Sequence, residues 1–410
     1  MNPQRQILEL VEYGAPLRLP AARLSQANGE LLWRAYEPKG YLTVQFPGPK
    51  TGGEWELRSG GWVGYLPVSA DLGVALRPKV PLGNLFRMLE YAYRLKSFRL
   101  MNDLIDSESL GEFYGRLAHI LANRVLDRAR RGLYRVYIGY RERLPYVRGR
   151  LDTLAALRRH WDVSLDCEYE EHTADIEDNQ ILAWTLLCVA RSGVCSEQVQ
   201  SAVRKAYRAV QGIVAPLPIS PRACVRRLYN RLNDDYEPMH GLCRFLLENT
   251  GPTHQTGDHT MIPFVVNMAQ LFELFVAEWL RAHLPEGLVL KTQEPVPLSE
   301  DGLRFEIDLV IYERGADAAR CVVDTKYKAP DQPSPDDIAQ VIAYAQAKGC
   351  TEAILAYPRP LPKPLVTVIG GIRVRSLGFE LDGDLGDAGH RFLSALFGNE
   401  ETAWQDRPEI

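Results

Sequence analysis

The chain has 410 residues, 46% of them hydrophobic, so it is long enough for two or three globular domains, and its composition excludes a disordered chain. Its net charge of −4 excludes nucleic-acid binding through overall charge, so any such contact must come from local basic clusters. Its seven cysteines contain no C-x-x-C pair, which argues against a zinc module and against a disulfide framework.

The N-terminal sequence, MNPQRQILELVEYG, lacks a basic stretch followed by an apolar run. No segment approaches the roughly 18 consecutive apolar residues that a membrane-spanning helix needs. The sequence therefore predicts a soluble, cytoplasmic protein that does not interact with a membrane.

Residues 1–82 alternate between apolar and polar types in runs such as ILELVEY, GYLTVQF and VGYLPV, with Gly and Pro between the runs. This pattern predicts a β-rich N-terminal domain. From residue 83 the apolar residues recur with the period of a helix, and we expect a mainly helical middle domain over residues 83–250. A strand excursion at YRVYIGYRERL interrupts the expected helices.

A basic stretch lies in this middle domain. Between Arg124 and His160 there are eleven arginines and three acidic residues, interleaved with tyrosines, a combination that suits phosphate contact and base stacking. The candidate contacts to DNA or to a partner protein are Arg128, Arg131, Arg135, Arg148 and Arg150. The stretch 162–178 that follows is acidic and has no Lys or Arg, so internal pairing between the two stretches is the third interpretation.

The polar stretch GPTHQTGDHT has no periodicity, and we expect residues 251–263 to form a linker. Residues 264–410 then carry a strong helix, two strand-like runs, a Pro-rich loop, another helix and another strand. This order predicts an α/β domain with a mixed sheet, and the whole chain is expected to be a multidomain α+β protein.

Two of the predicted strands in this last domain carry acidic residues. In LRFEIDLVIY, Asp308 alternates with apolar residues, and in CVVDTKYK the residues Asp324 and Lys326 share one strand face. We expect these three side chains to lie on exposed strand faces. Adjacent strands would bring the two carboxylates together, and with the backbone carbonyl of Thr325 they form an oxygen site suited to Mg²⁺, or to Mn²⁺ as a substitute. Lys326 could position or deprotonate the attacking water, so the pattern predicts phosphodiester hydrolysis.

Helices on both sides of these strands supply further candidates. Glu273 falls at the border of the apolar arc of NMAQLFELFVAEWLRAHL, where it could contribute to catalysis and to metal binding. Downstream, Ser334 is a typical N-cap, followed by a first-turn Pro and two acidic residues. In the helix that it begins, Gln340 and Tyr344 stand at i and i+4 and would support the site.

The ordered set of helix Glu, strand Asp, D-x-K and Q-x-x-x-Y resembles the PD-(D/E)xK nuclease superfamily, in the branch with RecB-like nucleases, over about residues 264–358. Ile307 stands where the superfamily label has Pro, and this difference removes no ligand. The segments RPKVPLGNLFRMLEYAY, YVRGRLD, NMAQLFELFVAEWL and VVDTKYK further resemble McrC, the nuclease subunit of McrBC modification-dependent restriction systems.

The McrC resemblance implies a hexameric McrB-like AAA+ GTPase as partner and double-stranded, modified DNA as substrate, with the McrC-like subunit cutting DNA and stimulating the GTPase. No G-x-x-x-x-G-K-[ST] motif is present, so the nucleotide would be hydrolysed by another chain. Two alternatives stay open from the sequence: a self-sufficient RecB-like DNA nuclease, and a non-catalytic adaptor that regulates an AAA+ motor.

Overall fold

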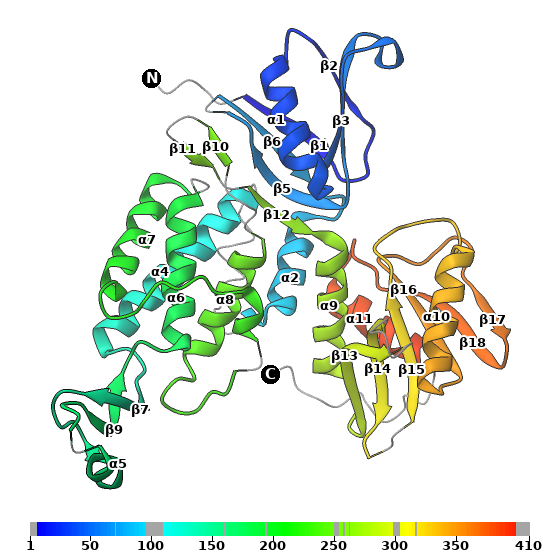
Figure 1. Cartoon of the computed structure of the whole chain (residues 1–410). Helices are drawn as coiled ribbons and strands as arrows, with labels where there is room; N and C mark the ends of the chain where they lie inside the picture. Colours follow the sequence, from blue (N-terminus) through cyan, green and yellow to red (C-terminus); the bar gives the residue numbers. More distant parts are fainter. Residues whose placement is uncertain are drawn as a thin grey trace. The chain divides into compact units, whose positions relative to one another are not determined.

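The computed structural model describes residues 6–398 except 70, 96–109, 160, 193–194, 226, 250–253, 257–258, 262, 298–303 and 316–317. The chain divides into two compact units. The first combines Met1–Ser109 with Phe264–Ile410, and the second is Leu110–Pro263. Figure 1 labels their helices and strands. No helix in the described part of the chain combines the length and apolar character needed to cross a bilayer.

The N-terminal part of the first unit contains two small sheets. One has the order β1 (Gln6–Val11), β6 (Leu72–Arg77), β5 (Trp62–Pro67) and β12 (Phe264–Asn267), and the other has the order β2 (Leu17–Pro20), β4 (Glu54–Ser59) and β3 (Leu42–Gln45). Helix α1 (Gln26–Tyr36) packs closely on them, since a Cβ atom at Gly29 would lie 2.2 Å from the ring of Trp55. Two 3-10 turns, η1 (Glu37–Lys39) and η2 (Pro49–Thr51), complete this part.

This grouping differs from the segments expected from the sequence. Strand β12 pairs with β5, so the chain after residue 263 begins inside the N-terminal sheet. Helix α2 (Leu82–Ala92) packs on α9 (Met268–His283), where the rings of Tyr91 and Phe275 lie 5.8 Å apart between centroids. The described residues of 6–95 and 264–398 therefore share one unit, in which Val265 is part of the N-terminal core and Phe275 contacts Tyr91.

The second half of the first unit is built on a six-stranded sheet (Figure 1). Its order is β13 (Leu288–Pro297), β14 (Arg304–Glu313), β15 (Ala319–Thr325), β16 (Glu352–Tyr357), β18 (Ile372–Gly378) and β17 (Val366–Ile369). The β15–β16 and β16–β18 pairs are parallel and the other pairs are antiparallel, which confirms the expected mixed sheet.

Helices cover both faces of this sheet. Helix α10 (Pro335–Lys348) packs through Val341 on the face that carries Val322 and Leu355. Residues at alternate positions, such as Val323 and Ile354, are also fully buried. Helices α9 and α11 (Leu385–Phe397) contact the sheet as well. Residues on both sides of each central strand are therefore shielded from water.

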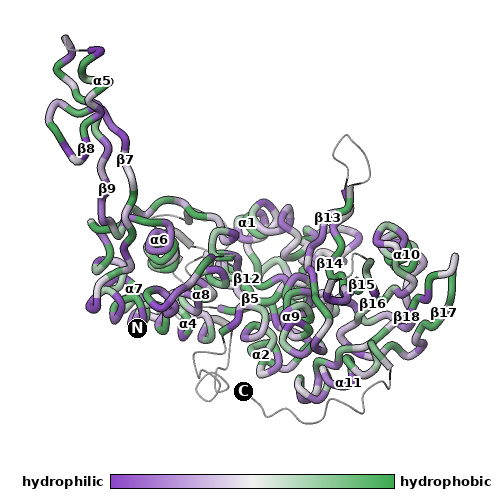
Figure 2. Tube along the Cα trace, turned by 90° about the horizontal axis from the view of Figure 1, so that it is seen from below, coloured by the Kyte–Doolittle hydropathy of each residue, from purple (hydrophilic) through white to green (hydrophobic). Residues whose placement is uncertain are grey.

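The second unit is a bundle of helices with a projecting arm. The bundle contains α4 (Leu110–Arg131), α6 (Glu177–Ser192), α7 (Glu197–Val210), α8 (Tyr236–Glu248) and the 3-10 turn η4 (Pro221–Cys224). We call residues 136–173 the arm; it consists of β7 (Val136–Leu144), β8 (Arg150–Leu151), α5 (Thr153–Arg158) and β9 (Leu165–Thr173). The strand excursion expected from the sequence is thus one side of a hairpin. Figure 2 shows the arm extending well beyond the helices of its unit.

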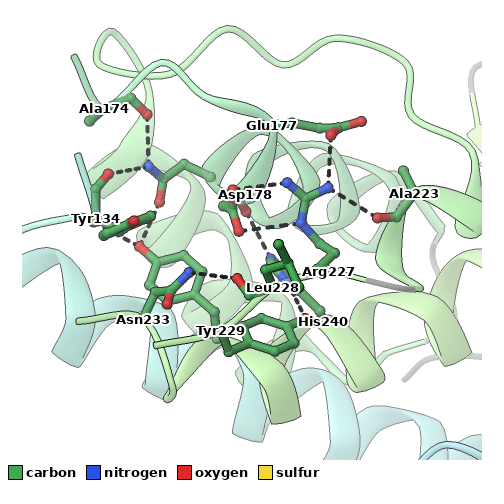
Figure 3. A network of polar contacts seen from close by, with 12 residues as sticks. Tyr134, Ala174, Glu177, Asp178, Ala223, Arg227, Leu228, Tyr229, Asn233 and His240 are labelled. Atoms are coloured by element: carbon green, nitrogen blue, oxygen red, sulfur yellow. Dashed lines mark hydrogen bonds and ion pairs between the residues drawn. The ribbon is translucent and has the colours of Figure 1, made fainter. Parts of the chain in front are cut away.

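A network of polar side chains holds the root of the arm (Figure 3). The Asn179 Nδ2 atom donates to the carbonyl oxygens of Tyr134, at 2.8 Å, and Ala174, at 2.7 Å, which flank the two long strands. The Tyr236 hydroxyl donates to Asn179 Oδ1 at 2.6 Å and accepts from the Tyr134 N–H at 3.0 Å. Both ends of the hairpin are therefore tied to the helices α6 and α8.

The same figure shows a second set of contacts at the start of α6. Arg227 forms an ion pair with Asp178 at 2.9 Å, and His240 Nε2 lies 3.0 Å from the Asp178 carbonyl oxygen. Burial holds the pKa of His240 well below its ordinary value, so this imidazole is neutral at physiological pH. These contacts fix the segment before α8 on α6.

Of the segment expected to be a linker, residues 251–253, 257, 258 and 262 lie outside the described residues. The described part forms a short antiparallel pair, β10 (His254–Thr256) with β11 (His259–Met261).

Candidate active site

Strands β14 and β15 bring Asp308, in the middle of β14, and Asp324, near the end of β15, together. The ladder between these strands ends at the pair Leu309 with Val323, and the two aspartates occupy the next positions on their strands. Asp308 Oδ2 accepts hydrogen bonds from the N–H and from the hydroxyl of Thr325, each at 2.8 Å. The juxtaposition expected from the sequence is therefore present.

The expected exposure of these strand faces is wrong. Asp324 is only 1% exposed, and the side chain of Lys326 is 18% exposed. The alternation in the sequence was consistent with a sheet that has one solvent-exposed face, but helix α10 covers that face. A carboxylate in this position is shielded from water and depends on its neighbours for stabilisation.

Lys326 joins the carboxylates to helix α10. Its Nζ atom lies 2.8 Å from Asp324 Oδ2 and donates to Gln340 Oε1 at 2.9 Å. Gln340 Nε2 in turn donates to the Tyr344 hydroxyl at 2.6 Å. The structure thus connects Asp324, Lys326, Gln340 and Tyr344 in one chain of polar contacts.

The start of α10 explains why this helix presents Gln340 to the strand. Ser334 caps the helix by accepting from the Asp337 N–H at 3.2 Å, and Pro335 occupies the first turn. At the other end Gly349 adopts a left-handed conformation, which ends the helix. The helix start predicted from the sequence is confirmed.

Glu273 belongs to the same acidic cluster. It is half-buried on α9, and its Oε1 atom accepts a hydrogen bond from Gln293 Nε2 at 3.3 Å. Burial raises the pKa of Glu273 above its ordinary range, and the charge of Asp308 raises this pKa further. The pKa of Asp324 rises to about 6 because of burial and the charge of Asp308, although Lys326 opposes the rise.

The donor chemistry of this cluster suits a hard cation. The charge of Asp308 raises the pKa of both Asp324 and Glu273, so these carboxylates repel one another, and a divalent ion bound by oxygen atoms would offset that repulsion. In the described part of the chain, no three His, Cys, Asp or Glu side chains already converge to hold a metal. Asp308 and Asp324, with the Thr325 carbonyl, are thus the residues that could hold Mg²⁺, while Glu273 is not part of a preformed triad.

A contact from the N-terminal sheet reaches the site and was not expected from the sequence. The Tyr327 hydroxyl donates to Glu12 Oε1 at 2.7 Å, and Glu12 is 1% exposed. The Tyr327 ring lies 5.9 Å from that of Phe272, between centroids. Tyr327 follows Lys326 and Phe272 precedes Glu273, so the N-terminal sheet supports both. No local signal predicts a contact between residues 315 positions apart.

The sequence also gave no signal for Gln293. Its position on β13 lies between the pairs Thr292 with Leu309 and Glu294 with Ile307, so it faces Asp308 in the ladder. Its backbone has a φ of 49°, although it is not a glycine. A single unconventional backbone angle in a strand leaves no trace in the hydrophobic pattern.

The five arginines proposed as DNA or partner contacts lie in the second unit and differ in their surroundings. Arg128 forms an ion pair with Asp235 at 3.3 Å, and Arg131 donates to the Asp127 carbonyl at 3.4 Å. Arg148 is 3.4 Å from Glu171. Arg135 is exposed just before the arm begins, and Arg150 is exposed on β8 of the arm.

The basic and acidic stretches of the sequence face each other across the arm. Strand β7 pairs with β9 along its whole length, and the ion pairs between them or their flanking turns include Arg141 with Glu168, Arg143 with Asp162 and Arg148 with Glu171. Ion pairs within the arm therefore neutralise much of the positive charge of the basic stretch. Arg148 also lies 3.8 Å from the ring centre of Tyr169.

Comparisons with known proteins bear on the identity of the chain. The family model described as "McrBC 5-methylcytosine restriction system component" matches residues 57–358. The type IV methyl-directed restriction enzyme EcoKMcrBC of Escherichia coli (strain K12) is 24% identical over 265 residues, which cover 61% of this chain and 74% of that protein.

One solved structure is similar in fold. It is a refined half-complex from a tetradecameric assembly of Thermococcus gammatolerans McrB AAA+ hexamers with bound McrC, and the matched chain gives a TM-score of 0.52 at 16% identity. The match covers 95% of this chain and 100% of that chain. The family model spans most of the sequence, from the N-terminal sheet to the end of β16, and therefore the chain belongs to the McrBC 5-methylcytosine restriction system component family.

Proposed function

We propose that this chain is the endonuclease subunit of a McrBC-type restriction system and hydrolyses phosphodiester bonds of DNA with Mg²⁺, as a PD-(D/E)xK nuclease. The observation that carries the proposal is the cluster of Asp308, Asp324 and Lys326 on two adjacent strands and the residue that follows one of them, joined to Gln340 of α10. Mn²⁺, which has the same preference for oxygen ligands, would substitute for Mg²⁺.

The cation would supply Lewis acidity and lower the pKa of a bound water. Asp308 and Asp324 would hold it, and the hydrogen bonds from Thr325 fix the Asp308 carboxylate in one orientation. Gln340 and Asp324 together hold the Lys326 ammonium group in place. Preorganised groups of this kind need no rearrangement as charge develops on the phosphate.

The pKa of Lys326 favours one of the two roles that its position allows. Burial lowers this pKa, but the hydrogen bond and charge of Asp324 raise it more, so the net pKa lies above the ordinary value. A lysine that stays protonated cannot act as the general base. We assign Lys326 to orienting the attacking water and stabilising negative charge on the phosphate. Glu273, whose pKa is raised, would receive or hold a proton beside the cluster.

We further propose that the chain works with an AAA+ GTPase partner on methylated DNA. The net charge of −4 and the internal pairing of the arm leave little positive charge for DNA binding by this chain alone. A motor that holds DNA would raise the effective concentration of substrate at the site. The solved structure that resembles this chain contains McrB AAA+ hexamers.

The end of the arm is the surface that we assign to the partner. Large apolar side chains are exposed there, including Leu157 at 74%, Trp161 at 73% and Val163 at 86%. Exposed apolar groups gathered at one end of an element mark protein contacts more often than contacts with phosphates. The exposed Arg150 on the same arm stays a candidate for a polar rim of that contact, and Arg135, which precedes the arm at its root, stays a candidate for contact with DNA or with the partner.

The test compares cleavage of methylated and unmethylated plasmid by the chain alone and by the chain with its co-purified AAA+ partner and GTP, in Mg²⁺ or in EDTA. The proposal predicts cutting only of methylated DNA, only with partner, GTP and Mg²⁺. Robust cutting by the isolated chain at about 150 mM salt would instead indicate a self-sufficient nuclease. Stimulation of the partner's GTPase without any cleavage would indicate a non-catalytic adaptor.

A further inference from the structure

Gln293 has a backbone conformation that its residue type disfavours. Its φ of 49° lies in the left-handed region, where a side chain with a Cβ atom is crowded and glycine is the usual occupant. The residues on both sides, Thr292 and Glu294, form regular pairs with β14. The strain is therefore local to one position inside a paired strand, and surrounding structure must impose it.

The strained position lies at the acidic cluster. Gln293 lies opposite Asp308, between the pairs Thr292 with Leu309 and Glu294 with Ile307, and its Nε2 atom donates to Glu273 Oε1 at 3.3 Å. The side chain thus connects β13 to α9 beside the two strand carboxylates. Non-glycine residues with left-handed backbones are concentrated at functional sites because strain is tolerated where a side chain must be aimed.

The environment of Glu273 explains why a donor is needed there. The charges of Asp308, Glu306 and Asp324 all act unfavourably on the ionised Glu273 side chain. Repulsion of this kind would turn the carboxylate away from the cluster unless a donor holds it. The amide of Gln293 donates to this carboxylate without adding charge.

We propose that Gln293 is a positioning residue of the nuclease site, whose amide holds the Glu273 carboxylate toward Asp308 and Asp324 at the expense of backbone strain. This inference rests on the proposed nuclease function. It separates two contributions of one residue: the backbone of Gln293 lowers stability, and its side chain supports catalysis. A residue with a purely structural role would not show that separation.

Two substitutions distinguish these contributions. Both Gln293→Gly and Gln293→Ala remove the amide, but only glycine relieves the strain. In thermal unfolding in EDTA, we expect the glycine variant to melt about 2–4 °C above the alanine variant. In cleavage of methylated plasmid by the assembled complex with GTP and Mg²⁺, we expect both variants to lose roughly tenfold in kcat with KM unchanged.

Arg94→Gly provides a matched control. Arg94 also has a positive φ, of 54°, and is exposed at the end of α2, where its Nε atom lies 2.9 Å from Glu278. We expect this variant to cleave at the wild-type rate. Loss of cleavage in Arg94→Gly equal to that in Gln293→Gly would overturn the inference, because backbone changes anywhere in the unit would then explain the effect.

The remaining outcomes separate this inference from the proposed function. If the wild-type complex cleaves DNA, Asp324→Ala abolishes cleavage and Gln293→Gly cleaves at the wild-type rate, the role of Gln293 alone is overturned. Cleavage rates that follow the melting temperatures of the two Gln293 variants would also overturn it. A wild-type complex that never cleaves DNA would overturn the proposed function, and the inference with it.

Discussion

Replacing Asp324 by asparagine should stabilise the metal-free protein while abolishing cleavage. Asp324 is 1% exposed, and burial with the charge of Asp308 raises its pKa from 3.8 to about 6. The folded state therefore binds the proton more tightly than the unfolded state does. Stability contributed by the protonated form is present below pH 4 and is lost as the pH rises through about 6.

The size of the expected stabilisation follows from the difference in the pKa of Asp324 between the folded and unfolded states. A shift of about two pKa units corresponds to roughly 3 kcal/mol at neutral pH, and because this shift already includes the opposing effect of the Lys326 ion pair, we expect a gain of up to about 3 kcal/mol in the variant. The assay is urea unfolding in EDTA at pH 7.5 and at pH 4.5. Asp324→Asn should exceed the wild type in free energy of unfolding at pH 7.5, and the difference should shrink at pH 4.5.

The opposite result would refute the reasoning. An asparagine variant that is less stable than the wild type in EDTA at pH 7.5 would mean that the ion pair with Lys326 outweighs burial and the repulsion from Asp308. Mg²⁺ gives a second readout: it should raise the stability of the wild type and not that of Asp324→Asn, because the variant lacks a ligand.

Three further predictions concern Gln340, Tyr327 and the end of the arm. Gln340→Ala should lower kcat about tenfold, because Lys326 loses the acceptor that holds it at 2.9 Å; equal rates in steady-state cleavage would contradict this role. Tyr327→Phe should cost about 1–3 kcal/mol in urea unfolding because Glu12 stays buried without that donor, and an unchanged midpoint would show that the contact contributes little. Trp161→Ser should weaken co-elution with the AAA+ partner without changing the melting temperature. Undiminished co-elution would show that the end of the arm is not the contact surface.

The sequence predicts those parts of the site that depend on local spacing. Asp324 and Lys326 are two positions apart on one strand, and Gln340 and Tyr344 are one helical turn apart, so periodicity alone places each pair on one face. Pairing of adjacent strands then brings Asp308 beside them. The proposed catalytic roles of these residues stay predictions until cleavage is measured.

What the sequence could not predict depends on contacts between distant segments. The four residues of β12 carry no sign that they pair with β5, some 200 positions earlier, so the N-terminal sheet and the segment after residue 263 do not form two independent domains. The contact of Tyr327 with Glu12 has the same origin. The burial of Asp324 was missed because strand alternation shows which residues share a face and not whether a helix covers that face.

The most direct test of the account is cleavage of methylated plasmid by complexes that contain wild-type chain or Asp308→Asn, each with the AAA+ partner, GTP and Mg²⁺. Asparagine keeps an oxygen that can accept from the N–H and hydroxyl of Thr325, so fold and assembly should be preserved. The account predicts cutting by the wild type and none by Asp308→Asn, with equal GTPase stimulation by both. Undiminished cutting by the assembled Asp308→Asn complex would show that hydrolysis occurs elsewhere.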